Sequence, residues 1–233
     1  GMGIILFTLA VVPMLNSSGG MQMFNAEVTG ITHDKLRPRI SQTAKSLWLI
    51  YTVLTLVLFG LLYLGPMEGF DALCYSLAVM STGGFATSDS GLSLWNSDYI
   101  EAVVTIFMFL GGVSFTLIYR AVHREFRAVW NNDVFRLYIW MILGVYVLFV
   151  ANILYVGSYT GIKSVTLDPL FQIISMMSST GFEVADFGTW GTFVLAVTFV
   201  LMFFGACAGS TSGGAKLDRL IYMLKNCRNE IER

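Results

Sequence analysis

Residues 71–85 read DALCYSLAVMSTGGF, and residues 168–182 read DPLFQIISMMSSTGF. Each stretch begins with an aspartate, continues as an apolar segment and ends in a short run of Ser, Thr and Gly. In both, a glycine (Gly84 or Gly181) follows the aspartate after 13 residues and is itself followed by phenylalanine. The chain therefore carries two copies of one motif.

The spacing of the two copies extends beyond the motif. They are offset by 97 residues, and the same offset relates Gly112 to Gly209. Similarity at a fixed spacing indicates a repeated structural unit. We predict one unit over 46–119 and a second over 137–224.

The composition is typical of a protein that lies in a membrane. Hydrophobic residues make up 55% of the chain and charged residues 12%, and mean hydropathy is +0.69. Because a spanning helix needs roughly 20 apolar residues, the charge-free windows indicate an all-α integral membrane protein. These windows are 46–67, 102–119, 137–162 and 187–215. The spans that we predict from them are 46–65, 99–119, 137–157 and 190–207.

Basic residues predict the orientation of these spans. All but Lys163 fall into three clusters that lie on one side, which the positive-inside rule makes cytoplasmic. The clusters are Lys35, Arg37, Arg39 and Lys45; Arg120, Arg124, Arg127 and Arg136; and Lys216, Arg219, Lys225, Arg228 and Arg233. The net charge of −1 gives no sign of a nucleic-acid partner.

Acidic residues gather on the opposite side. Carboxylates are tolerated there without any role, but at a pore mouth they would raise the local cation concentration. The candidates for such a role are Asp89, Glu183 and Asp186.

The two motifs lie in segments that are too short to span. With both ends outside, each must enter the membrane and return, as a re-entrant loop does where its backbone is buried or lines water. We expect Asp71 and Asp168 to cap short helices that run inward, with Pro169 at a first helical position. The negative carboxyl ends of such helices favour a cation near the membrane midplane. The predicted fold is thus a repeated helix–re-entrant pore loop–helix unit, as in potassium channels.

The Ser/Thr/Gly runs supply the candidate ion-binding atoms. Gly84 and Gly181 permit backbone angles closed to other residues, so successive carbonyl oxygens can face one axis. Rings of such carbonyls replace the hydration shell of K⁺. Phe85 and Phe182 are expected to pack behind the loops. The predicted filter residues are Ser81, Thr82, Gly83, Gly84 and Phe85, and Ser178, Ser179, Thr180, Gly181 and Phe182.

Residues 205–214 read GACAGSTSGG and interrupt the last apolar window. A run so rich in glycine and hydroxyl residues does not form a stable helix interior. Beneath a filter it predicts a gate loop, although a close small-residue helix crossing is the alternative. The gate-loop residues are Gly205, Gly209, Ser210, Thr211, Ser212, Gly213 and Gly214. Residues 216–233 alternate apolar and basic and are expected at the cytoplasmic surface.

Enzymatic interpretations of these residues fail. In a phosphate-binding loop the lysine directly follows the second fixed glycine, but here Ala215 separates Gly214 from Lys216. A serine hydrolase needs a base near its serine, and both histidines, His33 and His123, lie in predicted cytoplasmic loops.

Several short motifs together resemble the TrkH family of bacterial potassium-uptake subunits, in the Trk/Ktr/HKT superfamily. They are GMGII at 1–5, GGMQM at 19–23, KLRPRI at 35–40, the GGF filter at 83–85, and CAGSTSGG at 207–214. The resemblance implies four helix–pore loop–helix repeats around one pore, with Gly84 and Gly181 in the second and third. It also implies a homodimer, a cytoplasmic nucleotide-binding regulatory subunit (TrkA-like), and no cofactor in the pore subunit itself.

Against that pattern, the first and fourth pore loops are missing, so we expect the chain to be a piece of a longer protein in the bacterial plasma membrane. A sodium-selective or sodium-coupled relative is one alternative, because in some relatives the first filter distinguishes K⁺ from Na⁺. A non-conducting membrane scaffold is another. The expected organisation is 1–16, the tail of a preceding repeat; 17–45, a cytoplasmic loop; 46–119, a pore repeat; 120–136, a cytoplasmic loop; 137–224, a pore repeat; and 225–233, a cytoplasmic tail.

Overall fold

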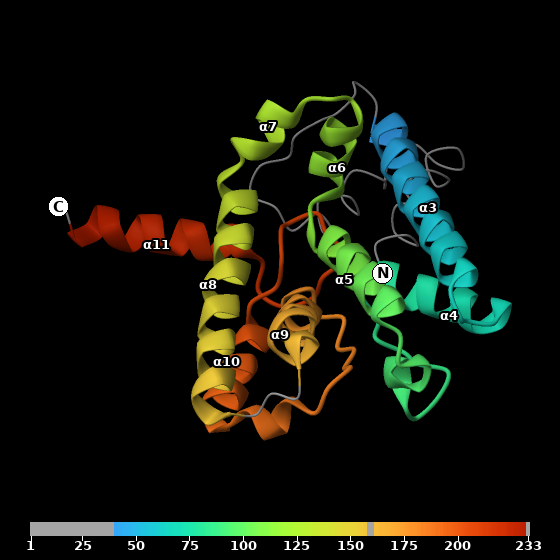
Figure 1. The fold of residues 1–233 in the computed structure, drawn as a ribbon. Coiled ribbons are helices and arrows are strands. Elements are labelled where there is room, and N and C mark those ends of the chain that lie inside the picture. Colours follow the sequence, from blue (N-terminus) through green and yellow to red (C-terminus); the bar gives the residue numbers. More distant parts are fainter. Residues whose placement is uncertain (1–39, 158–160, 232–233) are drawn as a thin grey trace.

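The computed structural model describes residues 40–157 and 161–231, and Figure 1 shows their arrangement. The described part is helical, with one isolated parallel bridge between Phe204 and Ala215. This confirms the predicted all-α fold. The expectations for residues 1–16 and for most of 17–45 lie outside the described residues.

Two units of the same design follow one another along the chain. The first consists of α3 (Ile40–Leu64), α4 (Gly69–Met80), the 3₁₀ turn η1 (Gly91–Trp95), α5 (Asp98–Gly112) and α6 (Phe115–Val122). After the connecting helix α7 (Phe126–Trp130), the second consists of α8 (Asp133–Val156), α9 (Ile162–Met177), η2 (Phe187–Trp190), α10 (Thr192–Phe203) and α11 (Leu217–Ile231). The second series repeats the first element by element.

Helix length and hydropathy fit a membrane. Two helical stretches, Lys45–Leu64 and Asp133–Val156, are long and apolar enough to cross, and the described residues hold a third if α5 and α6 count as one span. At 1.5 Å per residue, α8 extends about 36 Å. Its outer face exposes Trp140, Val147 and Tyr155, as expected of a surface whose solvent is lipid.

Specific residues set the ends of α8. The Asn132 side chain accepts a hydrogen bond from the Phe135 N–H at 2.9 Å and so caps the start of the helix. Gly157 ends it with a left-handed φ of 75°.

The units pack on each other through their central helices. α3 contacts α4, α5 and α6 within the first unit, and α8 contacts α9 and α10 within the second. α5 and α9 join the two, and they lie side by side in the centre of Figure 1. α11 extends away from this body and continues across the predicted boundary at 224/225.

The structure differs from the predicted span at 99–119, because α5 and α6 meet at an angle of 107°. The chain is extended at Val113 (φ −82°, ψ 145°). The Gly111 and Gly112 carbonyl oxygens, which a continuous helix would use internally, accept instead from the N–H groups of Thr211 (3.2 Å) and Cys207 (3.1 Å). The bend therefore depends on a segment about 100 residues away in the sequence.

Gly112 is the tightest point of this contact, which leads to a test of the packing. A Cβ at Gly112 would overlap the Tyr138 hydroxyl and lie 3.1 Å from the Ala206 Cβ. We expect Gly112→Ala to destabilise the folded protein by about 1–3 kcal/mol, seen as a lower melting temperature of the detergent-purified whole protein. Gly144→Ala is the matched control, because no atom of the described neighbours lies within 4 Å of its Cβ position. An equal effect of both variants would contradict the packing.

Candidate functional site

The two Ser/Thr/Gly loops have one backbone conformation. Thr82 and Gly84 have left-handed φ values of 51° and 67°, and Ser179 and Gly181 have 57° and 80°. Equivalent amides turn back onto the preceding helix. The bonds are Thr82 N–H to Val79 O (3.0 Å) and Gly83 N–H to Ala78 O (2.7 Å), and Ser179 N–H to Met176 O (3.0 Å) and Thr180 N–H to Ser175 O (2.9 Å). The two loops therefore repeat in backbone conformation as well as in amino-acid sequence.

The sequence analysis does not predict the left-handed conformations of Thr82 and Ser179, because it expects unusual backbone angles only at the glycines. Positive φ is uncommon outside glycine. The only sequence signal for this conformation is a hydroxyl residue two positions before the filter glycine in both copies.

The two loops touch each other. A Cβ at Gly84 would fall on the Thr180 carbonyl oxygen, so the backbones approach as closely as glycine permits. Around Gly181, in contrast, no described atom lies within 4 Å of the Cβ position. The first loop is thus packed against the second, whereas no described residue packs against the glycine of the second.

An aromatic contact fixes the second loop on the first unit. Phe182 is buried, and its ring lies 5.6 Å from the fully buried ring of Tyr75 on α4, at an interplanar angle of 28°. Tyr75 also meets Trp95 of η1 edge-on at 5.2 Å. Phe182 therefore packs behind its loop as predicted, on a partner from the other unit.

The same prediction is wrong for Phe85, whose side chain is 80% exposed. Phe182 is buried because Tyr75 of the neighbouring unit lies against it. No described residue takes that place beside Phe85.

The predicted helix caps are also wrong. α4 begins at Gly69, so Asp71 lies within its first turn and accepts a hydrogen bond from the Thr87 hydroxyl (2.7 Å). α9 begins at Ile162, which places Asp168 and Pro169 inside the helix. The aspartates follow the helix starts because the chain already turns into each helix at Glu68 and Gly161.

The three outer acids lie in the segments that follow the loops. Asp89, Glu183 and Asp186 are all exposed. Asp186 has a local structural role, since its carboxylate accepts from the Gly188 N–H at 3.0 Å and caps η2.

The predicted gate loop is an ordered break rather than a helix. α10 ends at Phe203, α11 begins at Leu217, and the Gly205 N–H donates to the Ala215 carbonyl at 2.8 Å. A Cβ at Gly205 would overlap the Gly213 carbonyl oxygen, so the loop closes tightly on itself. Within it, the Ser210 and Ser212 hydroxyls are 2.9 Å apart, and Ser212 Oγ accepts from the Ala206 N–H at 3.1 Å.

This loop contacts both the bend of the first unit and its Ser/Thr/Gly loop. The Phe115 N–H donates to the Gly209 carbonyl at 3.0 Å, and the Thr211 hydroxyl donates to the Gly111 carbonyl at 3.0 Å. The Thr82 hydroxyl donates to the Thr211 carbonyl at 2.8 Å. The predicted filter and the predicted gate are therefore hydrogen-bonded to each other.

Two charged residues beside the loop were not predicted as part of the site. The Lys216 ammonium donates to the Ser212 carbonyl and to the Ser212 hydroxyl (3.1 Å), with the residue only 9% exposed. Asp218 is 5% exposed, and neither of its carboxylate oxygens has a hydrogen-bond partner among the described residues. The signal was the position of both residues directly after the glycine-rich break.

The arrangement suits a weakly hydrated monovalent cation. The carboxyl ends of α4 and α9, each equivalent to roughly half a negative charge, lead directly into the two touching loops. The groups offered there are backbone carbonyls and hydroxyls, which bind alkali cations without a net charge of their own.

The whole chain, residues 1–233, matches the family model TrkH, described as cation transport protein. The Trk system potassium uptake protein TrkH of Escherichia coli K12 is 33% identical over 235 residues, covering 100% of this chain and 48% of the relative. TrkG of the same organism is 30% identical over 99% of the chain. The crystal structure of the potassium transporter TrkH from Vibrio parahaemolyticus superimposes with a TM-score of 0.80 at 29% identity, over 100% of this chain and 47% of that one. The chain spans about half the length of the curated relatives it matches.

Proposed function

Because the chain belongs to the TrkH family of cation transport proteins, we propose that it forms two of the units around a potassium-uptake pathway in the bacterial plasma membrane. The observation that carries the proposal is a pair of loops with left-handed residues at the same positions and in direct backbone contact, Gly84 against the Thr180 carbonyl. The two loops have left-handed residues at the same positions, and in our proposal this lets them present their carbonyls in the same way. In our proposal they are re-entrant filter loops, and residues 81–85 and 178–182 supply carbonyl ligands to K⁺.

The segment 205–214 is the gate of this pathway in our proposal. Its Thr211 carbonyl accepts a hydrogen bond from Thr82, a residue of the first filter loop. Movement of the gate loop would therefore displace the first filter loop, to which it is hydrogen-bonded. The exposed acids Asp89, Glu183 and Asp186 would attract cations to the outer mouth.

We further propose a homodimer and a cytoplasmic nucleotide-binding partner for the whole protein, with no cofactor in this subunit. A sodium-selective pathway is the nearest alternative. Carbonyl and hydroxyl oxygens bind both ions, so the choice between K⁺ and Na⁺ depends on the complete filter.

The proposal is tested on the whole protein, supplied with its partner subunit in cells that lack their own potassium uptake. We expect Rb⁺ influx well above that of empty-vector cells, and growth at low external K⁺. Influx of Na⁺ in place of Rb⁺ would favour the sodium alternative. Background influx of both ions, despite normal insertion in the membrane, would favour a non-conducting scaffold.

A further inference from the structure

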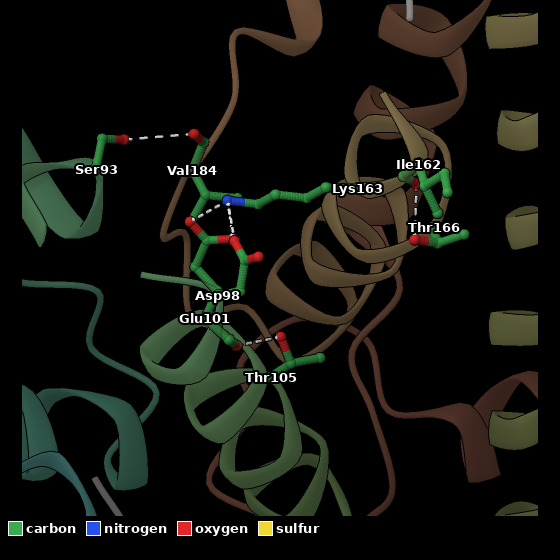
Figure 2. A network of polar contacts seen from close by, with 8 residues as sticks. All are labelled: Ser93, Asp98, Glu101, Thr105, Ile162, Lys163, Thr166 and Val184. Carbon is green, nitrogen blue, oxygen red and sulfur yellow. Dashed lines mark hydrogen bonds and ion pairs between the residues drawn. The ribbon is translucent and has the colours of Figure 1, made fainter. Parts of the chain in front are cut away.

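A lysine at the start of α9 ties the two units together (Figure 2). The Lys163 ammonium lies 2.8 Å from Oε2 and 2.9 Å from Oε1 of Glu101, and 2.9 Å from Oδ1 of Asp98. Both acids belong to the first turn of α5. Lys163 is therefore bonded to a helix of the other unit, 62 residues away in the sequence.

The two acids differ in burial, and therefore in how strongly the ion pair with Lys163 stabilises them. The Glu101 side chain is 3% exposed and that of Asp98 is 74% exposed. A buried carboxylate without a counter-charge is strongly unfavourable, whereas an exposed ion pair contributes little. Glu101 is thus the acid that holds Lys163 in place.

The ammonium responds to this pairing. Its partial burial alone would lower the pKa of Lys163, but the hydrogen bonds to Glu101 and Asp98 outweigh that effect and raise it. Lys163 therefore stays charged through the physiological range.

The position of Lys163 connects the contact to the second filter loop. Lys163 lies in the first turn of α9, and the opposite end of the same helix leads into residues 178–182. The contacts that join the units near this loop include the Phe182–Tyr75 stack and a hydrogen bond from the Ser93 hydroxyl to the Val184 carbonyl at 3.4 Å. α9 is therefore held to the first unit at both ends.

The lysine has no counterpart at the equivalent position of the first unit. The position 97 residues before Lys163 is Pro66, which carries no charge. Residues that maintain only the general fold of a repeat are expected in both copies, so the single lysine serves the junction between the units.

We propose that Lys163 is a positioning residue for cation discrimination: by bonding to Glu101 it sets the height and tilt of α9, and with them the register of residues 178–182 against residues 81–85. The proposal rests on the proposed potassium pathway. Lys163 itself contacts no ion. It acts through α9, and its loss shifts one set of carbonyls relative to the other.

The test measures Rb⁺ and Na⁺ influx by the whole protein with its partner subunit, at matched amounts in the membrane. We expect Lys163→Met to lower the Rb⁺/Na⁺ influx ratio by about tenfold, within the range of measured couplings between distant sites. Lys163→Arg should retain the ratio, because a guanidinium can bond to the same carboxylate. The exchange Lys163→Glu/Glu101→Lys should restore most of it.

A second variant separates positioning from stability. Lys163→Met leaves Glu101 buried without a partner, but Lys163→Met/Glu101→Gln removes both charges and should reach the membrane normally. Loss of discrimination in this double variant supports the proposal. A normal Rb⁺/Na⁺ influx ratio in the double variant, or in Lys163→Met, overturns the proposed role of Lys163 but not the proposed potassium pathway. A wild type that conducts no Rb⁺ overturns the proposed function and this role with it.

Discussion

Replacing Gly84 with serine is expected to reduce Rb⁺ influx by about a hundredfold, a larger loss than the same change at Gly181. A non-glycine residue at the φ of 67° costs about 1–2 kcal/mol. Overlap of the new Cβ with the Thr180 carbonyl adds about 1–3 kcal/mol, because neither backbone can move aside freely. Together these terms correspond to a factor of order 100 in the population of the native loop.

Gly181→Ser should cost only the first of these two terms, or about tenfold, since no described atom lies within 4 Å of its Cβ position. Gly83→Ala is the control within the same loop. Its Cβ would meet the side chains of Ser81 and Phe85 at 3.2 and 3.3 Å, and both can rotate away. Influx is measured as the initial rate of Rb⁺ uptake by the whole protein, corrected for its amount in the membrane.

The order of the three variants is the decisive result. If Gly181→Ser were as damaging as Gly84→Ser, a part of the whole protein beyond the described residues would lie against Gly181 as Thr180 lies against Gly84. If Gly84→Ser conducted normally, the two loops would not be in backbone contact during conduction, and the proposed filter would be wrong.

The repeat was predictable because it depends on local chemistry. Glycine is favoured at positive φ, so Gly84 and Gly181 mark their loops in the sequence itself. Long apolar windows likewise mark α3 and α8, since a membrane leaves few other structures for such segments. Neither inference needs to know what packs against what.

The failed predictions for Phe85 and for the span 99–119 both depend on contacts between distant segments. Phe85 and Phe182 have equivalent sequence surroundings, but only Phe182 has Tyr75 beside it. The bend at Val113 follows from hydrogen bonds to Cys207 and Thr211. Periodicity and composition carry no information on such pairings.

Grouping the basic residues by their position in the sequence also missed the structural roles of two lysines. Lys216 was grouped with the cytoplasmic basic residues, yet it is buried against Ser212. Lys163 lies outside every basic cluster, and its role was not evident from the sequence because its partners, Glu101 and Asp98, lie on a different helix. A lysine near a membrane span thus has two possible roles, and only the fold distinguishes them.

Removing the charges of Lys216 and Asp218 together should raise the maximal rate of Rb⁺ influx by about tenfold. The Lys216 ammonium holds the Ser212 carbonyl and hydroxyl, and so fixes the segment 205–214 in the conformation described. A hydrogen bond from a charged donor contributes about 1.5–3 kcal/mol, which is tenfold or more in the equilibrium between a fixed and a released loop. The variant is Lys216→Met/Asp218→Asn, because Lys216→Met alone would leave the buried Asp218 carboxylate without its neighbouring positive charge.

A released gate should change the maximal rate more than the external K⁺ concentration at half-maximal influx, because the filter loops keep their own contacts. Arg219→Met is the matched control, an exposed basic residue beside the same loop. Unchanged influx at normal membrane levels would mean that the segment 205–214 does not obstruct the pathway. Reduced influx would mean that Lys216 supports the conducting conformation instead, since the bond that it makes with Ser212 would then belong to the open loop. The sign of the change therefore identifies which of the two gate conformations the lysine stabilises.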